Sequence, residues 1–429
     1  MKTPALLAFT LSAGCVLTVA CSQSTELSRF QFTPNDNSVR NAEPGSSGYQ
    51  RLHDFGAGHD GSRPNGLIGV GGVLYGTTQG GGTMYCGGAY GGCGTVFSIG
   101  ADGKERVLHN FGNGKDGHNP IAGLLDVRGT LYGTTEGGGA HGYGTVFSIT
   151  PGGKEKVLYS FGVRPDGQGP SADLIAVGGT LYGTTFAGGL GCASEGCGTV
   201  FSVTMDGRER VLHWFNDVTD GDGWYPAAGL TDVNGTLYGT TLEGGKYGTY
   251  GNWGTLFSVT LGGKERLIHS FGKGNDGWYP EADLVDIKGA LFGTTVGGGT
   301  HNCAGGYGGC GTVFSITTNG KERLLHSFDG IDGSSPKASL VDVSGTLYGT
   351  TAGGGAYECG AYGRCGTVFS ITPAGREKVL HSFRLAGGYR PLAGVSHVSG
   401  RFFGAAQLGG PHGRRGGEYG GGVVFSLVP

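Results

Sequence analysis

The sequence is poor in charge, in proline and in long apolar runs. Charged residues make up 15% of the 429 residues, and 30 basic against 33 acidic side chains leave a net charge of −3. A chain so close to neutral offers no electrostatic case for nucleic-acid binding. The 15 prolines, and glycines without a three-residue period, exclude a collagen-like rod. A sustained 3.6-residue periodicity is missing too, which excludes a mainly helical protein.

Several motifs of common catalytic sites are also missing. There is no P-loop, no G-x-S-x-G and no H-E-x-x-H. Residues 56–61, 112–117 and 272–277 satisfy G-x-G-x-x-G, but none of them opens a helix, as a dinucleotide site requires. The sequence therefore predicts no cofactor, no metal and no identifiable catalytic residue.

The N-terminal sequence is typical of an export signal. Lys2 precedes an apolar run from Ala5 to Ala20, which is too short to span a bilayer comfortably. The run ends in a lipobox-like segment before Cys21, so we expect a signal peptide over residues 1–21 and lipidation of Cys21. Cleavage without a lipid is the alternative. Residues 22–48 are polar and predict a flexible tether.

Glycine is what the chain has in excess, with 96 residues, and it recurs inside a repeat. Each unit carries a strand-like run such as Val107–Phe111, then Asp116-Gly117, then Leu-Tyr-Gly-Thr-Thr, and finally Gly-Thr-Val-Phe-Ser. The units start at residues 51, 107, 157, 211, 267, 324 and 379. A period of about 50–57 residues with four short β-rich runs is typical of a propeller blade.

The turns between these runs predict how the ring closes. Two-residue turns ending in glycine, such as Asn234-Gly235 and Asp102-Gly103, are typical of β-hairpins. The first unit opens on a fourth strand, about residues 49–55, and the last ends on a third strand, about residues 422–428. Pairing these two strands would close a seven-bladed all-β propeller over residues 49–429 and hide both edges. An open β-solenoid is the alternative.

The repeat resembles a known family. The order Leu-Tyr-Gly-Thr-Thr, Gly-Thr-Val-Phe-Ser and Gly-Lys-Glu-Arg-Val-Leu-His-Ser-Phe is similar to the Gloeobacter–Verrucomicrobia tandem repeat in all seven units. Unit seven departs most, with Phe402-Phe403-Gly404-Ala405-Ala406. The resemblance implies an extracytoplasmic location, because these repeats accompany surface-anchoring signals, and it implies no activity.

Eight cysteines occur as pairs at one loop position of the repeat. Because both members of a pair are present or absent together, we expect four local disulfides, which indicate an oxidising compartment. The pairs are Cys86/Cys93, Cys192/Cys197, Cys303/Cys310 and Cys359/Cys365. We expect them to pin loops and not to join blades. Export is therefore expected to the bacterial outer membrane or cell surface, or otherwise to the periplasm or the medium.

Two neighbouring units carry aromatic loop residues. Trp224-Tyr225 and Trp278-Tyr279 each precede a proline. Such side chains can stack on sugar rings or anchor a protein partner. The alternative is that they pack as loop cores between blades.

Acidic and histidine residues recur as well. Asp60, Asp116, Asp166, Asp220, Asp276 and Asp332 each precede glycine, and six histidines share one strand position, which Tyr159 takes in unit three. We interpret both series as structural. In unit four Asp217, Asp220 and Asp222 bring three carboxylates close together in the sequence, which makes them calcium candidates. They are weak candidates, because they do not fit the calcium-loop pattern.

The function favoured by the sequence is a surface binding module for a glycan or a protein, attached to the membrane only through its lipid anchor. An enzyme is the competing class, as a polysaccharide hydrolase or lyase using carboxylates such as Asp220, Asp222, Asp276 or Glu281. A structural surface scaffold is the third.

Overall fold

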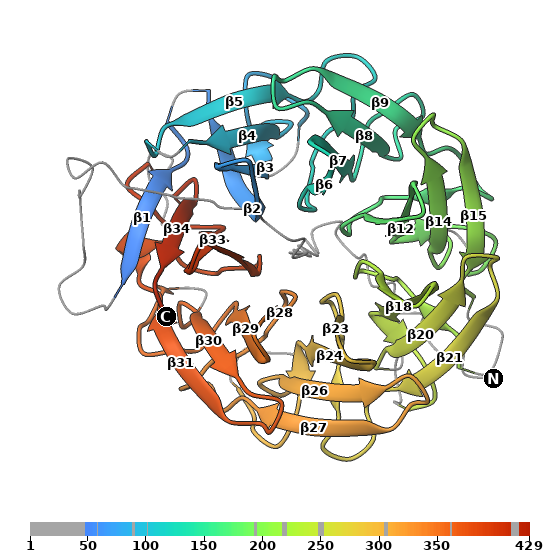
Figure 1. Ribbon diagram of the computed structural model, residues 1–429, viewed down its shortest axis with the longest axis vertical. Helices are drawn as coiled ribbons and strands as arrows, with labels where there is room; N and C mark the ends of the chain where they lie inside the picture. Colours follow the sequence, from blue (N-terminus) through green and yellow to red (C-terminus); the bar gives the residue numbers. More distant parts are fainter. Residues whose placement is uncertain are drawn as a thin grey trace, which may run out of the picture.

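A computed structural model of the chain describes residues 48–57, 59–87, 91–100, 102–192, 195–216, 221–247, 253–303, 308–360, 363–412 and 420–429. Over these residues the chain forms seven four-stranded antiparallel sheets. Figure 1 shows the sheets as blades around one axis. The predicted all-β, seven-bladed propeller is confirmed. In the described ranges no helix has the length and hydropathy that crossing a membrane requires.

Each blade runs from an inner strand to an outer strand. Blade one contains β2 (Gly61–Val70), β3 (Val73–Gly81), β4 (Thr95–Ile99) and β5 (Glu105–Asn110). Blade two contains β6 (Leu125–Val127), β7 (Thr130–Thr135), β8 (Thr145–Ile149) and β9 (Glu155–Ser160). Blade three contains β11 (Ile175–Val177), β12 (Thr180–Thr185), β14 (Thr199–Thr204) and β15 (Glu209–Trp214).

The later blades repeat this order. Blade four contains β17 (Thr231–Val233), β18 (Thr236–Thr241), β20 (Thr255–Thr260) and β21 (Glu265–Ser270). Blade five contains β23 (Val285–Ile287), β24 (Ala290–Thr295), β26 (Thr312–Thr317) and β27 (Glu322–Ser327). Blade six contains β28 (Val341–Val343), β29 (Thr346–Thr351), β30 (Thr367–Ile371) and β31 (Glu377–Ser382).

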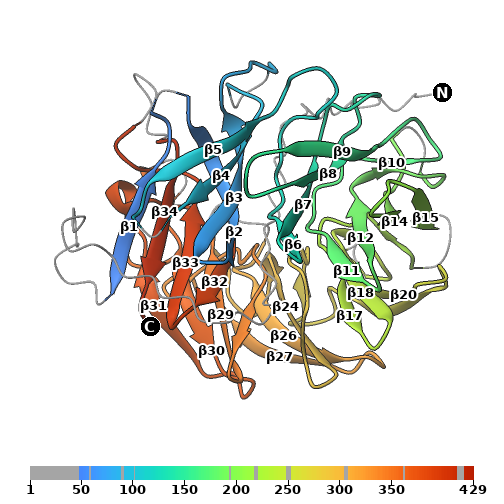
Figure 2. The ribbon, with the colours of Figure 1, turned by 45° about the horizontal axis from the view of Figure 1, so that its top comes forward.

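Blade seven is assembled from both ends of the repeat region. It contains β32 (Val395–Val398), β33 (Arg401–Ala406), β34 (Val423–Leu427) and, as its outer strand, β1 (Tyr49–Asp54). β1 pairs antiparallel with β34, from Tyr49 opposite Leu427 to Asp54 opposite Val423. Figures 1 and 2 both show the two strands side by side. The predicted closure of the ring is confirmed, and it leaves neither strand as an open edge.

Outside the blades the described residues form three two-stranded sheets and the 3-10 turn η2 (Leu385–Gly387). The sheets are β10 (Gly167–Gln168) with β13 (Ala187–Gly188), β16 (Gly223–Trp224) with β19 (Glu243–Gly244), and β22 (Gly277–Trp278) with β25 (Gly297–Gly298). All four belong to segments that follow the second or the fourth strand of a blade. We call the side of the ring that carries these segments the loop face, and the other side the turn face.

Tight turns on the turn face follow from the predicted residues. In blade four, Asn234 and Gly235 join β17 to β18 with φ of +54° and +80°. Two successive positive φ values match the twist of a β-hairpin, and glycine adopts the second without strain. The Asp232 carboxylate accepts a hydrogen bond from the Gly235 amide at 2.9 Å.

The Thr-Thr pair in the second strand of blades one to six holds the blade on two sides. In blade one, Thr77 Oγ1 donates to the carbonyl of Ala122 in the next blade at 2.7 Å. Thr78 Oγ1 bonds Thr95 Oγ1 of the same blade at 2.8 Å. One threonine therefore links neighbouring blades and the other links strands two and three.

The glycine of Leu-Tyr-Gly-Thr-Thr is required by the core. In blade four a Cβ on Gly239 would lie 2.7 Å from Cζ of Phe257 and 2.9 Å from Cδ2 of Leu230. Phe257 is 1% exposed, so its ring has no room to retreat. The phenylalanine of the third strand therefore fills the space that the glycine leaves.

We predict that Gly239→Ala destabilises the fold by about 1–3 kcal/mol, because the added methyl group overpacks this contact. Urea unfolding of the purified chain measures the change. Gly178→Asn is the matched control, because Gly178 has φ of +59° and no atom within 4 Å of an added Cβ. Asn234 adopts the same conformation in blade four. Equal losses in the two variants would contradict the packing argument.

Candidate functional site

The two predicted Trp-Tyr pairs occupy equivalent positions on the loop face. Trp224 ends β16 and Trp278 ends β22, and the tyrosine follows each directly. Tyr225 and Tyr279 have φ of +58° and +59°. Their amides and carbonyls hold the segment in place, since the Tyr225 amide donates to Cys197 O and its carbonyl accepts from the Leu242 amide.

The aromatic side chains of this region stack on one another. Phe186 stacks on Tyr225 with ring centroids 4.7 Å apart, and Tyr225 stacks on Trp224 at 5.8 Å. Trp253 stacks on Trp278 at 4.9 Å and meets Tyr279 edge to face at 5.6 Å. All are partly buried and partly exposed. We call this group the aromatic sector: Phe186, Trp224, Tyr225, Trp253, Trp278 and Tyr279.

The aromatic sector is confined to one part of the ring. The positions of Trp224 and Trp278 are filled elsewhere by Ser62, His118, Gln168, Ser334 and Tyr389. The positions of Tyr225 and Tyr279 are filled by Arg63, Asn119, Gly169, Ser335 and Arg390, all with φ between +52° and +63°. The same backbone therefore accepts small polar residues, so a blade does not need the Trp-Tyr pair for its fold.

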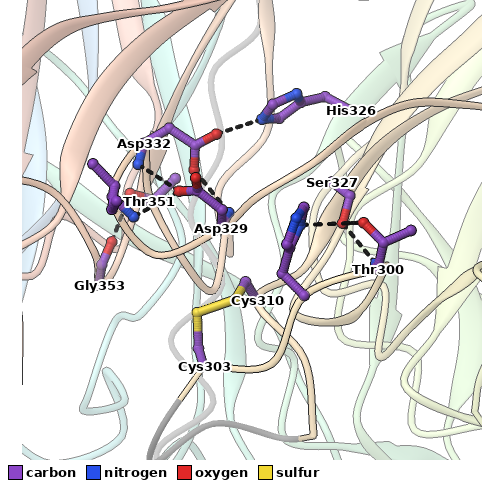
Figure 3. Close-up of a disulfide and its surroundings, with 11 residues drawn as sticks. Thr300, Cys303, Cys310, His326, Ser327, Asp329, Asp332, Thr351 and Gly353 are labelled. Atoms are coloured by element: carbon purple, nitrogen blue, oxygen red, sulfur yellow. Dashed lines mark hydrogen bonds and ion pairs between the residues drawn. A yellow bond between two sulfur atoms is a disulfide. The ribbon is translucent and has the colours of Figure 1, made fainter.

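All four predicted disulfides are present, with Cα–Cα separations of 5.1–5.4 Å. They are Cys86–Cys93, Cys192–Cys197, Cys303–Cys310 and Cys359–Cys365. Figure 3 shows Cys303–Cys310 near the end of β27, where Ser327 Oγ accepts a hydrogen bond from the Thr300 amide. Each disulfide links residues within one loop of the loop face. As covalent links the pairs are therefore local, as predicted.

The second cysteine of each pair corrects the expectation that these residues serve loops alone. It is fully buried, with an exposed fraction of 1% or less, at Cys93, Cys197, Cys310 and Cys365. Cys365 packs in one apolar cluster with Val368 and Phe383. Its carbonyl accepts a hydrogen bond at 2.9 Å from the amide of Arg390, in the segment that leads to the next blade. The spacing of the cysteines could not reveal this, because it reports the covalent link and not what the sulfur packs against.

Trp253 stands where other units have this second cysteine. A Cβ on Gly112 would meet Cys93 Sγ at 2.4 Å, and a Cβ on the equivalent Gly272 would meet Trp253 Cδ1 at 2.1 Å. The indole thus fills the space of the missing disulfide. Sequence reasoning missed Trp253 and Phe186, although the alignment of Trp253 with the second cysteine of each pair was a usable signal.

A cavity opens beside the aromatic sector in blade four. Its volume is about 360 Å³, and it is lined by Lys246, Tyr247, Leu267, Ile268, His269, Ser270 and Lys273. Lys246 follows β19, the strand that pairs with Trp224. Ser270 is 7% exposed, and its hydroxyl has no hydrogen-bond partner. In blades two and five the equivalent serines bind loop amides, so the loop after β18 departs from the pattern here.

The recurrent aspartates and histidines, which the sequence treats separately, pair with each other. In the loop between blades one and two, Asp116 Oδ2 lies 2.9 Å from Nε2 of His109, and its Oδ1 accepts from the Gly112 amide. The same contact recurs at 3.5 Å for His53–Asp60, 3.5 Å for His213–Asp222, 3.0 Å for His269–Asp276 and 2.7 Å for His326–Asp332. Tyr159 donates to Asp166 at 2.8 Å. The structural interpretation of both series is thereby supported.

Unit four corrects the sequence alignment. The Asp-Gly spacing aligns Asp220 with the recurrent aspartates, but among the described residues it is Asp222 whose carboxylate faces His213. Asp222 also accepts hydrogen bonds from Asn216. Asp217 and Asp220, two of the three calcium candidates, lie outside the described residues.

A glutamate from the next blade completes each of these contacts. It begins the outer strand and lies close to the Asp and His or Tyr of the preceding junction. Burial, followed by the neighbouring aspartate, raises the pKa of Glu209, Glu265 and Glu377 to about 7 and that of Glu322 to about 6, from 4.5. We call each such set of three residues a junction triad.

The junction between blades six and seven replaces the triad with aromatic packing. Tyr49 occupies the position of the glutamate in β1, and its ring stacks on His381 with centroids 4.0 Å apart. The Tyr49 hydroxyl donates to the carbonyl of Gly387 in η2. Burial, and then the charge of Arg384, lower the pKa of His381 to about 4.

The carboxylates considered for an enzyme are already engaged. Asp222 and Asp276 face histidines, as described above. Glu281 is 1% exposed and receives two hydrogen bonds from the Lys337 ammonium group, at 2.8 and 3.0 Å. All three carboxylates are therefore already in contact with a neighbouring side chain, and Asp222 also lies close to the carboxylate of Glu265.

Comparisons with known proteins identify the repeat family. The Gloeobacter/Verrucomicrobia repeat model matches residues 33–189, 82–305 and 248–429. No curated protein matches the chain. A gluconolactonase from Xanthomonas campestris is 15% identical, with a TM-score of 0.40, over 74% of this chain and 96% of its own. The PQQ-bound aldose sugar dehydrogenase of Streptomyces coelicolor is 12% identical, with a TM-score of 0.41, over 90% and 100%. Similarity this low says nothing of ligand or activity.

We predict that the junction glutamates make the fold less stable as pH rises. A carboxyl whose pKa is raised on folding costs nothing below pH 4.5 and destabilises the fold progressively as pH rises through about 7. Replacing Glu209, Glu265, Glu322 and Glu377 with Gln should raise the thermal midpoint at pH 8 and flatten its fall from pH 5 to pH 8. The exposed Glu358→Gln is the control. An unchanged slope in the fourfold variant would contradict the assignment.

Proposed function

The chain belongs to the Gloeobacter/Verrucomicrobia repeat family, and we propose that it is an exported binding module that holds a glycan on the aromatic sector of its loop face. One observation carries the proposal. Seven equivalent positions share one backbone conformation, yet only units four and five fill them with Trp-Tyr. The fold does not require the Trp-Tyr pairs, and they are concentrated in one part of the ring. Such a concentration of side chains is expected of a binding site.

The chemistry of these side chains suits a sugar. Partly exposed aromatic rings offer flat apolar area to the C–H faces of a pyranose ring. The rings are also held rigidly, because Phe186 and Trp253 stack against them. Rigid contact residues reduce the entropy lost on binding.

The cavity beside Trp224 extends the surface. Tyr247 is 36% exposed, and the lysines at positions 246 and 273 are also exposed. A polysaccharide lying across the aromatic sector could place a further sugar unit here. The unequal loop face favours a binding module over a scaffold without a discrete site.

Two further features support an extracytoplasmic location. Four disulfides fit an oxidising compartment, and the lipobox-like segment before Cys21 fits a lipid anchor. We therefore propose that the propeller lies outside the cytoplasm, tethered through Cys21. Cys21→Ser should release the chain from the membrane fraction, and retention there would count against this anchor.

We predict that a soluble chain starting at Ser22 binds one or more members of a panel of bacterial and plant polysaccharides, with saturable changes in Trp fluorescence. For Trp224→Ala/Trp278→Ala, binding of the same polysaccharides is measured by isothermal titration calorimetry. We expect no saturable binding, because two stacking platforms are removed. Trp214→Ala is the matched control, because Trp214 is exposed on β15 and makes no ring stack with the aromatic sector that the structure describes.

Near-ultraviolet circular dichroism confirms that each variant is folded. Binding that persists in the double variant would contradict the proposed surface. The absence of any response from the parent chain would contradict glycan binding and favour a protein partner.

A further inference from the structure

Two junction triads bring three metal-ligating side chains together. At the junction of blades three and four, ligand atoms of His213, Asp222 and Glu265 lie within 4.8 Å of one another. At the junction of blades five and six, the same holds for His326, Asp332 and Glu377. We propose that these two triads are binding sites for a divalent transition-metal ion such as Zn²⁺, which clamps the outer strands of neighbouring blades.

The spacing of the blade three–four triad leaves room for an ion. His213 Nε2 lies 3.5 Å from Asp222 Oδ2, which is too long for a good hydrogen bond. His53 and Asp60 stand at the same distance, but of these two junctions only the blade three–four triad also brings its glutamate within 4.8 Å. Two ligand atoms about 2.1 Å from a tetrahedral ion stand about 3.4 Å apart. The Asn216 side-chain amide holds Asp222 Oδ2 at 3.1 Å and so keeps it apart from the imidazole.

Each triad also contains a buried atom without a hydrogen-bond partner, which is Nε2 of His213 in the blade three–four triad and Oε1 of Glu377 in the blade five–six triad. Buried polar atoms are almost always satisfied, by protein, water or ion, and a metal ion would supply a partner to both atoms. Such atoms also occur at other junctions, at His53 Nε2 and at Oε1 of Glu105, Glu155, Glu209 and Glu322. The gathering of three ligand atoms is therefore what distinguishes the two triads.

The blade five–six triad needs a small rearrangement. Figure 3 shows His326 directed at Asp332, whose other oxygen accepts from the Asp329 amide. His326 Nε2 and Asp332 Oδ2 are 2.7 Å apart, so an ion would replace a direct hydrogen bond. We therefore expect this site to bind more weakly than the blade three–four triad.

The charges suit a divalent ion. Each triad contains one imidazole and two carboxylates, a set that Zn²⁺, Mn²⁺ and Co²⁺ accept with water in the remaining position. The two carboxylate charges equal the charge of the ion, so binding would neutralise a half-buried cluster. The side chains are partly exposed, with 18% for His213 and 21% for His326, which leaves a path for the ion.

The remaining junctions supply internal controls. Three junctions provide the same residue types, but their ligand atoms do not all lie within 4.8 Å of one another. These are His53, Asp60 and Glu105, then His109, Asp116 and Glu155, and then His269, Asp276 and Glu322. Tyr159 replaces the histidine between blades two and three, and Tyr49 replaces the glutamate between blades six and seven. The metal sites do not depend on glycan binding.

The test is the metal content of the soluble chain after equilibration with Zn²⁺ and gel filtration, measured by inductively coupled plasma mass spectrometry. We expect two ions per chain in two affinity classes, and a higher thermal midpoint with Zn²⁺. Glu265→Gln/Glu377→Gln should lose both ions and the shift in midpoint, while Glu105→Gln/Glu155→Gln should retain them.

Co²⁺ substitution gives a second readout. A visible absorption band of a four-coordinate ion should form in the parent chain and in the control variant, and not in Glu265→Gln/Glu377→Gln. Equal Zn²⁺ content in all three proteins would overturn the proposal, because it would place the ions elsewhere. A parent chain that binds no Zn²⁺ would overturn it too, and would leave the triads as hydrogen-bonded contacts only.

Discussion

The pairing of β1 with β34 is the constraint on which the rest of the structure depends. Every other blade forms from one continuous stretch of chain, whereas blade seven needs the first and the last strand of the repeat region together. Without this pairing both strands would be open edges, and the ring would have no fixed diameter. Closure therefore sets where each loop lies relative to the axis and gives the loop face its rigid base.

Contacts at the outer rim hold neighbouring blades in register. The outer strands follow one another around the rim, so the histidine near the end of one strand lies close to the glutamate that begins the next. An aspartate from the connecting loop joins them. Where the chain lacks these polar residues, between blades six and seven, Tyr49 and His381 stack instead. The rim thus uses either a polar cluster or an aromatic contact at the same place.

Most of the fold could be predicted from the sequence, because the same turn, strand and core residues recur in successive repeat units. The ring closure followed from the missing partners of the first and last strands.

The candidate site was predictable only as a set of positions. The pairing of Asp with His could not be predicted, since it depends on how the loop between them folds back. For the same reason the sequence aligned Asp220 at the place that Asp222 takes. The disulfide of Cys365 was predictable, but its burial between blades was not. The cavity beside Lys246 follows from one loop that departs from the repeat, which no pattern could reveal.

The Trp-Tyr pairs make blades four and five chemically distinct from the other blades of the propeller. The most direct measurement of this claim exchanges residues between blades. Trp224-Tyr225 is replaced by the His-Asn of blade two and Trp278-Tyr279 by the Ser-Ser of blade six, and urea unfolding and glycan binding are compared with those of the parent chain. The account predicts an unfolding midpoint close to that of the parent and loss of binding. A large loss of stability, or binding that survives the exchange, would contradict it, because the aromatic pairs would then serve the fold or have no role in recognition.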